Sequence, residues 1–183
     1  MTRIIGLSGS LRAGSYNSAL LRAAVDVMPE GAALEIASIR GIPLYDGDLE
    51  SEAGIPAPVA RLKEQIAATD GVLLVTPEYN NSIPGVFKNA IDWASRPPAD
   101  IDRVFGARPV AIVGVSAGQF GTILSQNAWL PVLRTLGMRL WSEGRLMVPR
   151  GGKMFGEEGQ LMDEKIKQRL VNFLSGFVEF TKR

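Results

Sequence analysis

Short β-rich runs alternate with longer helical runs along the whole chain, and this alternation limits the possible folds more than any other feature. The strand-like runs are residues 3–8, 34–39, 71–76, 108–116 and 145–148. The helix-like runs are residues 17–28, 57–69, 85–94, 122–137 and 160–181. Strands that alternate with helices predict an α/β fold, in which a five-stranded parallel sheet carries helices on both faces.

Several segments allow a finer prediction. The run "GVLLVT" at residues 71–76 is continuously apolar, which predicts a strand buried on both faces. Pro84 is expected in the first turn of the helix that begins near Gly85, where its missing N–H costs nothing. Pro131 is expected to interrupt or kink its helix, and residues 40–56 are expected to be irregular. The closing helix carries an apolar stripe made of Leu161, Ile166, Leu170, Phe173, Leu174 and Phe177.

The composition is that of an ordinary globular domain. The 183 residues are 46% hydrophobic and 21% charged, without an internal repeat or a long linker, so we expect one domain over residues 1–183. No apolar run reaches the roughly 18 residues of a membrane span, and no signal peptide is evident, which predicts a cytoplasmic protein without a membrane partner. The net charge of +1 comes with scattered basic residues, so no nucleic-acid partner is expected.

Two residue types are missing, and their absence excludes whole classes of chemistry. Without cysteine the chain has no disulfides, thiolate nucleophile or cysteine metal site. Without histidine it lacks the usual general base near neutral pH, the Ser-His triads and the commonest metal ligand. Chemistry must therefore come from carboxylates, hydroxyls, lysines, backbone dipoles or a cofactor, and we predict no metal site.

Unusual polar loops follow the first, third and fourth predicted strands. A doubly wound sheet with the strand order 2-1-3-4-5 gathers these three loops around one crevice at the carboxyl ends of the strands. The positions of the loops therefore favour that order.

The loop "GSLRAGSYN" at residues 9–17 combines glycines, hydroxyls and one guanidinium directly before a helix. Backbone N–H groups at a helix N-terminus, hydroxyls and an arginine are suited to a phosphate group. The Walker loop is excluded because Ser15 stands where lysine is required, and the spacing of the glycines does not fit the dinucleotide fingerprint. An ordinary capped helix, with Ser15 or Asn17 as the cap, is the alternative. The predicted phosphate-binding residues are Ser10, Arg12, Ser15, Asn17 and Ser18.

The loop "TPEYNNSIPG" at residues 76–85 is expected to bind the body of the same ligand. Pro77 is rigid, Tyr79 offers an aromatic flank, and Asn80 with nearby N–H groups can donate to the heteroatoms of a planar ring such as an isoalloxazine. Glu78 could contact the ligand, but support of the loop through backbone N–H groups is the favoured interpretation.

The third loop, "SAGQFGT" at residues 116–122, is rich in glycine and contributes Ser116 and Gly118 as candidate ring contacts. Lys88 and Asp92 are four residues apart on a predicted helix, so a surface ion pair is expected rather than a catalytic pair. Trp93 is expected in the core or in an interface.

The paired motifs "GSLRAGSYN" and "TPEYNNSIPGVFKNAIDW", together with "PLYDGDLE" and "SAGQFG", resemble those of the NADPH-dependent FMN reductase family. That family includes bacterial quinone, chromate and azo-dye reductases with a flavodoxin-like fold. The resemblance implies one bound FMN, with its phosphate on the first loop and its ring on Pro77, Glu78, Tyr79, Asn80, Ser116 and Gly118. It also implies a homodimer or homotetramer with the flavin near a subunit interface, although residues 119–129 match no familiar pattern.

The resemblance further implies NADPH or NADH as reductant, with a hydride passing to flavin N5 in a ping-pong reaction and two electrons then reaching a quinone or similar small acceptor. No side chain is expected to be an obligate acid or base, because the flavin carries the chemistry. The alternatives are a flavin reductase that supplies reduced FMN to a monooxygenase, a flavodoxin-type electron carrier, and a regulatory module without enzymatic activity. Electron carriers are usually strongly acidic, which the net charge of +1 disfavours.

Overall fold

A parallel sheet in the order β2-β1-β3-β4-β5 forms the centre of the computed structural model, which describes residues 1–183. Its strands are β1 (Thr2–Ser8), β2 (Ala32–Ala37), β3 (Gly71–Val75), β4 (Pro109–Val115), β5 (Arg139–Leu140) and β6 (Leu146–Val148). The predicted fold class and strand order are confirmed.

The sheet has six strands rather than the five predicted, because two short strands share its last position. β5 pairs with β4 at Pro109 and Val110, and β6 pairs with β4 from Val113 to Val115. The strand predicted at residues 145–148 is β6. β5 was missed because two residues carry no periodic signal.

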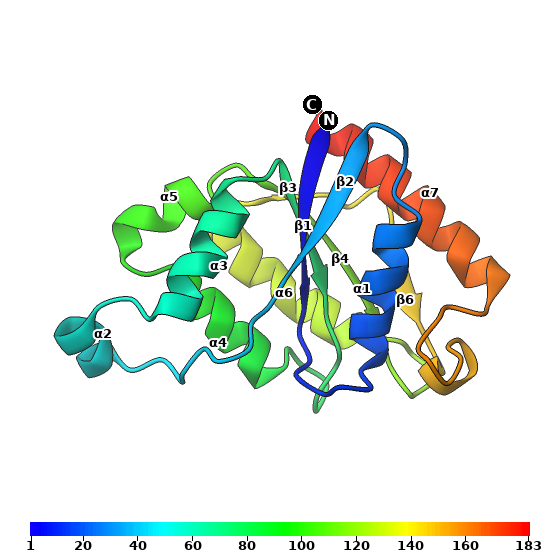
Figure 1. The fold of residues 1–183 in the computed structure, drawn as a ribbon, viewed down its shortest axis with the longest axis horizontal. Helices are drawn as coiled ribbons and strands as arrows, with labels where there is room; N and C mark the ends of the chain where they lie inside the picture. Colours follow the sequence, from blue (N-terminus) through cyan, green and yellow to red (C-terminus); the bar gives the residue numbers. More distant parts are fainter.

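The helices cover both faces of the sheet (Figure 1). α1 (Tyr16–Asp26) and α7 (Glu164–Thr181) pack on one face, and α3 (Ala57–Ala67), α4 (Gly85–Ala94) and α6 (Ile123–Thr135) pack on the other. The remaining short helices are α2 (Gly47–Ala53), η1 (Pro98–Asp100), α5 (Ile101–Val104) and η2 (Gly151–Lys153). No helix of the chain combines the length and the apolar character that crossing a bilayer would require.

Two hydrophobic cores result from this layering. In β3 every residue is buried, as its continuously apolar sequence predicted, because the strand lies in the middle of the sheet. Leu73 and Val75 face the core beneath α1 and α7, whereas Val72 and Leu74 face the core beneath α3, α4 and α6. The period of two along the strand thus divides its side chains between the two cores.

Three local predictions need correction. Residues 47–53 form α2 inside the stretch predicted to be irregular, and α2 buries none of its side chains, so no apolar period marks it. Pro131 does not interrupt its helix, since it lies inside α6 with its ring exposed, while Trp129 and Leu133 on either side are anchored in the core. α7 begins at Glu164 rather than at residue 160, because Asp163 caps it through the N–H of Ile166.

The segment that contains "PLYDGDLE" is held against α4 by polar contacts. Asn89 accepts a hydrogen bond from the N–H of Tyr45 (2.8 Å), and the Tyr45 ring meets Trp93 edge to face. The Arg96 guanidinium donates to the Glu50 carboxylate (2.8 Å) and lowers the pKa of that carboxyl below its ordinary value. Trp93 is fully buried, as expected for a core residue, and the predicted surface ion pair of α4, Lys88 with Asp92, is present at 2.7 Å.

Gly9 stands where the loop after β1 meets the loop after β3 and the start of α4. A β-carbon at this position would come within 2.3 Å of the Phe87 ring and 2.9 Å of the Pro77 ring. Phe87 is fully buried and packs against Trp129, so it has no room to move aside. The absence of a side chain at Gly9 therefore allows the two loops to approach each other.

We expect Gly9→Ala to reduce the free energy of unfolding by about 1–3 kcal/mol, since overpacking of a filled core is destabilising. Gly14→Ala in the same loop is the matched control, because a β-carbon there meets nothing within 4 Å. Urea denaturation of both variants checks the prediction. Equal stability of the two variants would contradict it.

Candidate functional site

The first polar loop places backbone donors at the start of α1. Ser15 is 4% exposed and is the N-cap residue, and its Oγ accepts a hydrogen bond from the N–H of Ser18 (3.3 Å). The N–H groups of Tyr16 and Asn17 have no acceptor in the chain. An N-terminal helix turn with unpaired N–H groups attracts anions, so this loop can bind a phosphate.

Arg12 stabilises the same loop and keeps most of its donors available. Its guanidinium donates to the carbonyl of Gly14 (2.6 Å) and lies 5.6 Å from the centre of the Tyr16 ring. Its backbone N–H donates to Ser10 Oγ (3.3 Å). Arg12 is exposed, so the other N–H groups of its guanidinium remain free for a ligand.

The side chains of Asn17 and Ser18, both predicted to bind phosphate, are engaged elsewhere. Asn17 donates to the Val115 carbonyl (2.8 Å) and accepts from the Val115 N–H (3.0 Å), which fastens α1 to β4. Ser18 Oγ lies 3.0 Å from Ser8 Oγ. At Asn17 the unpaired backbone N–H, rather than the side-chain amide, remains available to an anion.

The adjacent asparagines in the loop after β3 form a tight hairpin. Tyr79 and Ser82 exchange two backbone hydrogen bonds of 3.2 and 3.0 Å, and Asn80 and Asn81 between them both have positive φ, at 49° and 61°. A two-residue hairpin turn with positive φ at both positions is type I′, and asparagine tolerates this conformation well. The backbone conformation of this turn therefore explains why two asparagines stand here. The turn presents Tyr79 at the surface, where its side chain is 48% exposed.

A contact between Tyr79 and Ser10 brings the first two loops together. The phenolic oxygen lies 3.5 Å from Ser10 Oγ, although 69 residues separate the two in the sequence. The residues predicted to bind a phosphate and those predicted to bind a ring therefore share one end of the sheet.

Glu78 supports the loop, as the sequence favoured. Its Oε2 accepts hydrogen bonds from the N–H groups of Leu124 (2.8 Å) and Ser125 (3.0 Å) in the first turn of α6. A carboxylate at this end also interacts favourably with the helix dipole. Glu78 thereby ties the hairpin after β3 to α6.

A buried polar cluster reinforces this connection. The Thr76 hydroxyl lies 2.8 Å from Ser125 Oγ and accepts a hydrogen bond from the Trp129 indole N–H (3.2 Å). Thr76, Ser125 and Trp129 are all fully buried. Sequence reasoning missed this cluster because single polar residues within apolar runs carry no pattern.

Residues 150 and 151 connect the third loop with the first loop, although the sequence analysis did not assign them to the site. The carbonyls of Ser116 and Gly118 accept hydrogen bonds from the N–H groups of Gly151 (2.9 Å) and Arg150 (2.8 Å). A β-carbon on Gly151 would lie 2.8 Å from the Tyr16 ring, so only glycine permits this packing. The sequence signal was "PRGG" after β6, where Arg150 adopts a φ of 53°.

Known proteins are similar to this chain over nearly its whole length. The family model described as NADPH-dependent FMN reductase matches residues 2–153. A NAD(P)H-dependent FMN reductase of Pseudomonas aeruginosa is 42% identical over 181 residues, which cover 99% of this chain and 96% of the relative. A quinone reductase of Escherichia coli strain K12 is 38% identical over an alignment of 188 positions, which covers 99% of this chain and 96% of the relative.

Among solved structures, FerB of Paracoccus denitrificans, a flavoenzyme NAD(P)H:(acceptor) oxidoreductase, is similar over the whole chain. Its TM-score is 0.88 at 32% sequence identity, and the match covers 100% of this chain and 98% of FerB.

We expect Glu78→Ala to lower the free energy of unfolding by about 1–2 kcal/mol, because two N–H groups of α6 lose their acceptor. Glu78→Gln keeps an oxygen acceptor, so a smaller loss is expected. Urea denaturation measures both changes, with Glu52→Ala on the exposed helix α2 as the control for removing a carboxylate. A Glu78→Ala variant as stable as Glu52→Ala would refute the capping role.

Proposed function

The chain belongs to the NADPH-dependent FMN reductase family, and we propose that its three loops bind one FMN for the two-electron reduction of a quinone or a similar small acceptor. The chain is an FMN-dependent NAD(P)H oxidoreductase. The observation that carries the site assignment is the convergence of the first two loops at Ser10 and Tyr79.

The donors of the first loop fit the flavin phosphate. The unpaired N–H groups of Tyr16 and Asn17, the Ser10 hydroxyl and the free guanidinium donors of Arg12 lie on one short stretch of chain. A dianion at a helix N-terminus needs this combination of backbone donors and one cation. Ser15 contributes by capping the helix that presents the N–H groups.

The other two loops fit the ring of the cofactor. Pro77 is buried and rigid, the hairpin at Asn80 exposes its backbone, and Tyr79 offers an aromatic surface. On the far loop Gly118 is exposed, and a β-carbon there would meet only the Ser116 hydroxyl at 3.8 Å. Backbone groups can therefore come close to a planar ligand at this position.

FMN, when bound, supplies the chemistry of hydride transfer and electron transfer. The residues of the chain bind and orient the cofactor, and the backbone dipoles of the loops are suited to stabilise developing negative charge. Because Tyr79 and Gly118 are exposed, we propose that NAD(P)H and the acceptor occupy the same open surface in turn, which predicts ping-pong kinetics.

Quinones are the proposed acceptor class, because a curated relative that is 38% identical over nearly the whole chain is a quinone reductase. Reduction of chromate or azo compounds remains a prediction from the sequence resemblance, and location in the cytoplasm remains a prediction from the sequence alone. We also propose a homodimer or homotetramer, since exposed apolar side chains gather on α6 and on the loop before it. They are Phe120, Ile123, Leu124 and Leu130.

We expect Arg12→Ala to weaken FMN binding by about tenfold or more, since a charge-assisted contact to the phosphate is lost. Turnover at saturating FMN should change little, because Arg12 is not expected to act on the reacting ring. Quenching of flavin fluorescence measures the affinity, and steady-state assays at saturating FMN measure turnover. Normal flavin content with abolished turnover would contradict this assignment.

An anaerobic titration of the FMN-loaded protein tests the whole function. The expected result is that NADPH or NADH bleaches the visible flavin spectrum and that added benzoquinone restores it while FMN stays bound. Loss of FMN on reduction would favour a flavin reductase that supplies a monooxygenase. A spectrum that neither reductant changes would overturn the proposed function.

A further inference from the structure

A cavity of about 320 Å³ lies at the edge of the sheet, between α7 and the segment that joins β5 to β6. The segment contributes residues 141 and 143–145 to its walls, and α7 contributes Arg169, Asn172 and Phe173. None of these residues belongs to the three polar loops. β5 pairs with the start of β4, whereas the third loop follows the end of β4, so this cavity is separate from the proposed flavin site.

The indole of Trp141 lies on the α7 side of the sheet. Trp141 belongs to the core beneath α1 and α7, whereas Leu140 before it packs against the opposite core. The Trp141 ring meets the Phe173 ring edge to face, with the ring centres 4.6 Å apart. A β-carbon on Gly176 of α7 would lie 2.7 Å from Cζ2, on the edge of the indole that carries its N–H group. This edge therefore faces α7, the helix that forms one wall of the cavity.

The indole N–H group of Trp141 has no hydrogen-bond partner in the chain, although the side chain is only 5% exposed. The other two indoles are paired. Trp93 donates to the Pro43 carbonyl (3.0 Å), and Trp129 donates to the Thr76 hydroxyl (3.2 Å). Because buried donors are nearly always paired, an unpaired one beside a cavity points to an acceptor from outside the chain.

Further donors without partners surround the same cavity. Arg145 and Arg169 are exposed, and their guanidinium groups make no hydrogen bond and no ion pair within the chain. The side-chain oxygen of Asn172 accepts a hydrogen bond from Gln168 (3.0 Å), which leaves the amide N–H groups of Asn172 free. The cavity thus offers donors and positive charge to a ligand.

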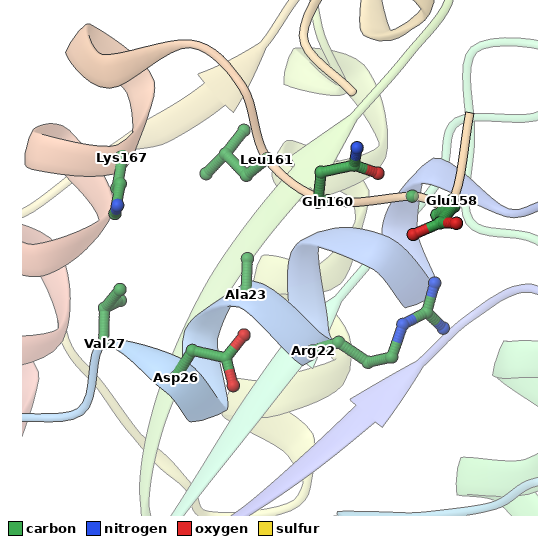
Figure 2. A pocket seen from close by; sticks show the side chains of 9 residues that line it. Arg22, Ala23, Asp26, Val27, Glu158, Gln160, Leu161 and Lys167 are labelled. Atoms are coloured by element: carbon green, nitrogen blue, oxygen red, sulfur yellow. The ribbon is translucent and has the colours of Figure 1, made fainter. Parts of the chain in front are cut away.

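The larger cavity on the other side of α7, toward α1, has no such excess of positive charge. Its volume is about 360 Å³, and Figure 2 shows two cationic and two anionic side chains around it, those of Arg22, Lys167, Asp26 and Glu158. The cavity beside Trp141 is lined by one carboxylate, that of Glu143, which is paired with Arg183 (3.0 Å). Its two arginines therefore remain without a compensating negative charge.

We propose that this cavity binds a small organic oxyanion, a carboxylate or a phosphate ester, through Arg145, Arg169 and the Trp141 N–H group. Guanidinium groups bind both kinds of oxyanion by charge-assisted hydrogen bonds. A volume of about 320 Å³ lies at the lower end of the range of small-molecule pockets, roughly 300–1,000 Å³, and suits an anion with an organic body. The Trp141 and Phe173 rings provide an apolar wall for that body. This ligand is additional to the cofactor, the reductant and the acceptor.

The test uses the FMN-loaded protein and three probes of similar size, which are benzoate, phenyl phosphate and the uncharged benzyl alcohol. Nitrogen–proton correlation spectra record the three indole N–H signals, and the signal missing from Trp141→Phe is that of Trp141. Arg145→Gln and Arg169→Gln are compared with the wild type and with Arg61→Gln. Arg61 is exposed on α3 and makes no ion pair, so its variant controls for the loss of one positive charge.

We expect benzoate or phenyl phosphate to shift the Trp141 signal until it saturates and to leave the signals of Trp93 and Trp129 in place. Each of the two arginine variants should weaken this binding about tenfold, the effect of one charge-assisted contact, while Arg61→Gln binds as the wild type does. Benzyl alcohol should leave the Trp141 signal unchanged. The anion that binds more tightly identifies the oxyanion as a carboxylate or a phosphate ester.

Four results would overturn the proposal. The first is a Trp141 signal that neither anion shifts, and the second is benzyl alcohol binding as tightly as the anions. The third is an equal loss of binding in Arg61→Gln, because the anions would then respond to net charge alone. The fourth is a changed oligomeric state of Arg145→Gln or Arg169→Gln in sedimentation, because this face would then be a subunit contact. Release of FMN by the anions, seen in the visible spectrum, would likewise contradict the proposal by assigning their binding to the flavin site.

Discussion

The parallel pairing of β1 with β3 is the constraint on which the site depends. In the register of this pair Ser8 lies opposite Val75, and the next N–H group, that of Gly9, donates to the Val75 carbonyl (2.9 Å). Both strands therefore end at the same level, and the chain leaves them as two adjacent loops. The helices that follow, α1 and α4, pack on opposite faces, so the loops diverge only after they have met.

Many of the polar side chains at this end of the sheet connect helices to strands and loops of the scaffold. Asn17 fastens α1 to β4, Glu78 caps α6, and Thr76 joins Ser125 and Trp129 in a buried cluster. Buried polar groups have to be paired, because an unpaired one costs about 1–3 kcal/mol. The donors left for ligands are therefore backbone N–H groups in the loops, the Ser10 hydroxyl and the exposed arginines. This division agrees with a protein that positions a cofactor and does not itself supply an acid or base.

Prediction from the sequence succeeded where the signal was local. The continuous apolar run of β3, the capped start of α1 and the ion pair of Lys88 with Asp92 each follow from a few neighbouring residues. It failed where tertiary packing overrode the local signal. Pro131 remains inside α6 because core contacts on either side hold the helix, and the two residues of β5 are a strand only because β4 lies beside them. The individual contacts of the predicted site residues with FMN remain predictions.

The sequence by itself determined the fold class, because periodicity and the alternation of strands and helices are properties of neighbouring residues and of chain direction. The positions of the polar loops only favoured the strand order that brings these loops together. Only the tertiary structure decided what each polar side chain does. Asn17 meets Val115 across 98 residues and Glu78 meets Ser125 across 47, whereas Arg145 and Arg169 line one cavity from two separate segments. Such pairings depend on how the helices pack against the sheet, and no local pattern in the chain encodes which side chain a distant segment will place beside another.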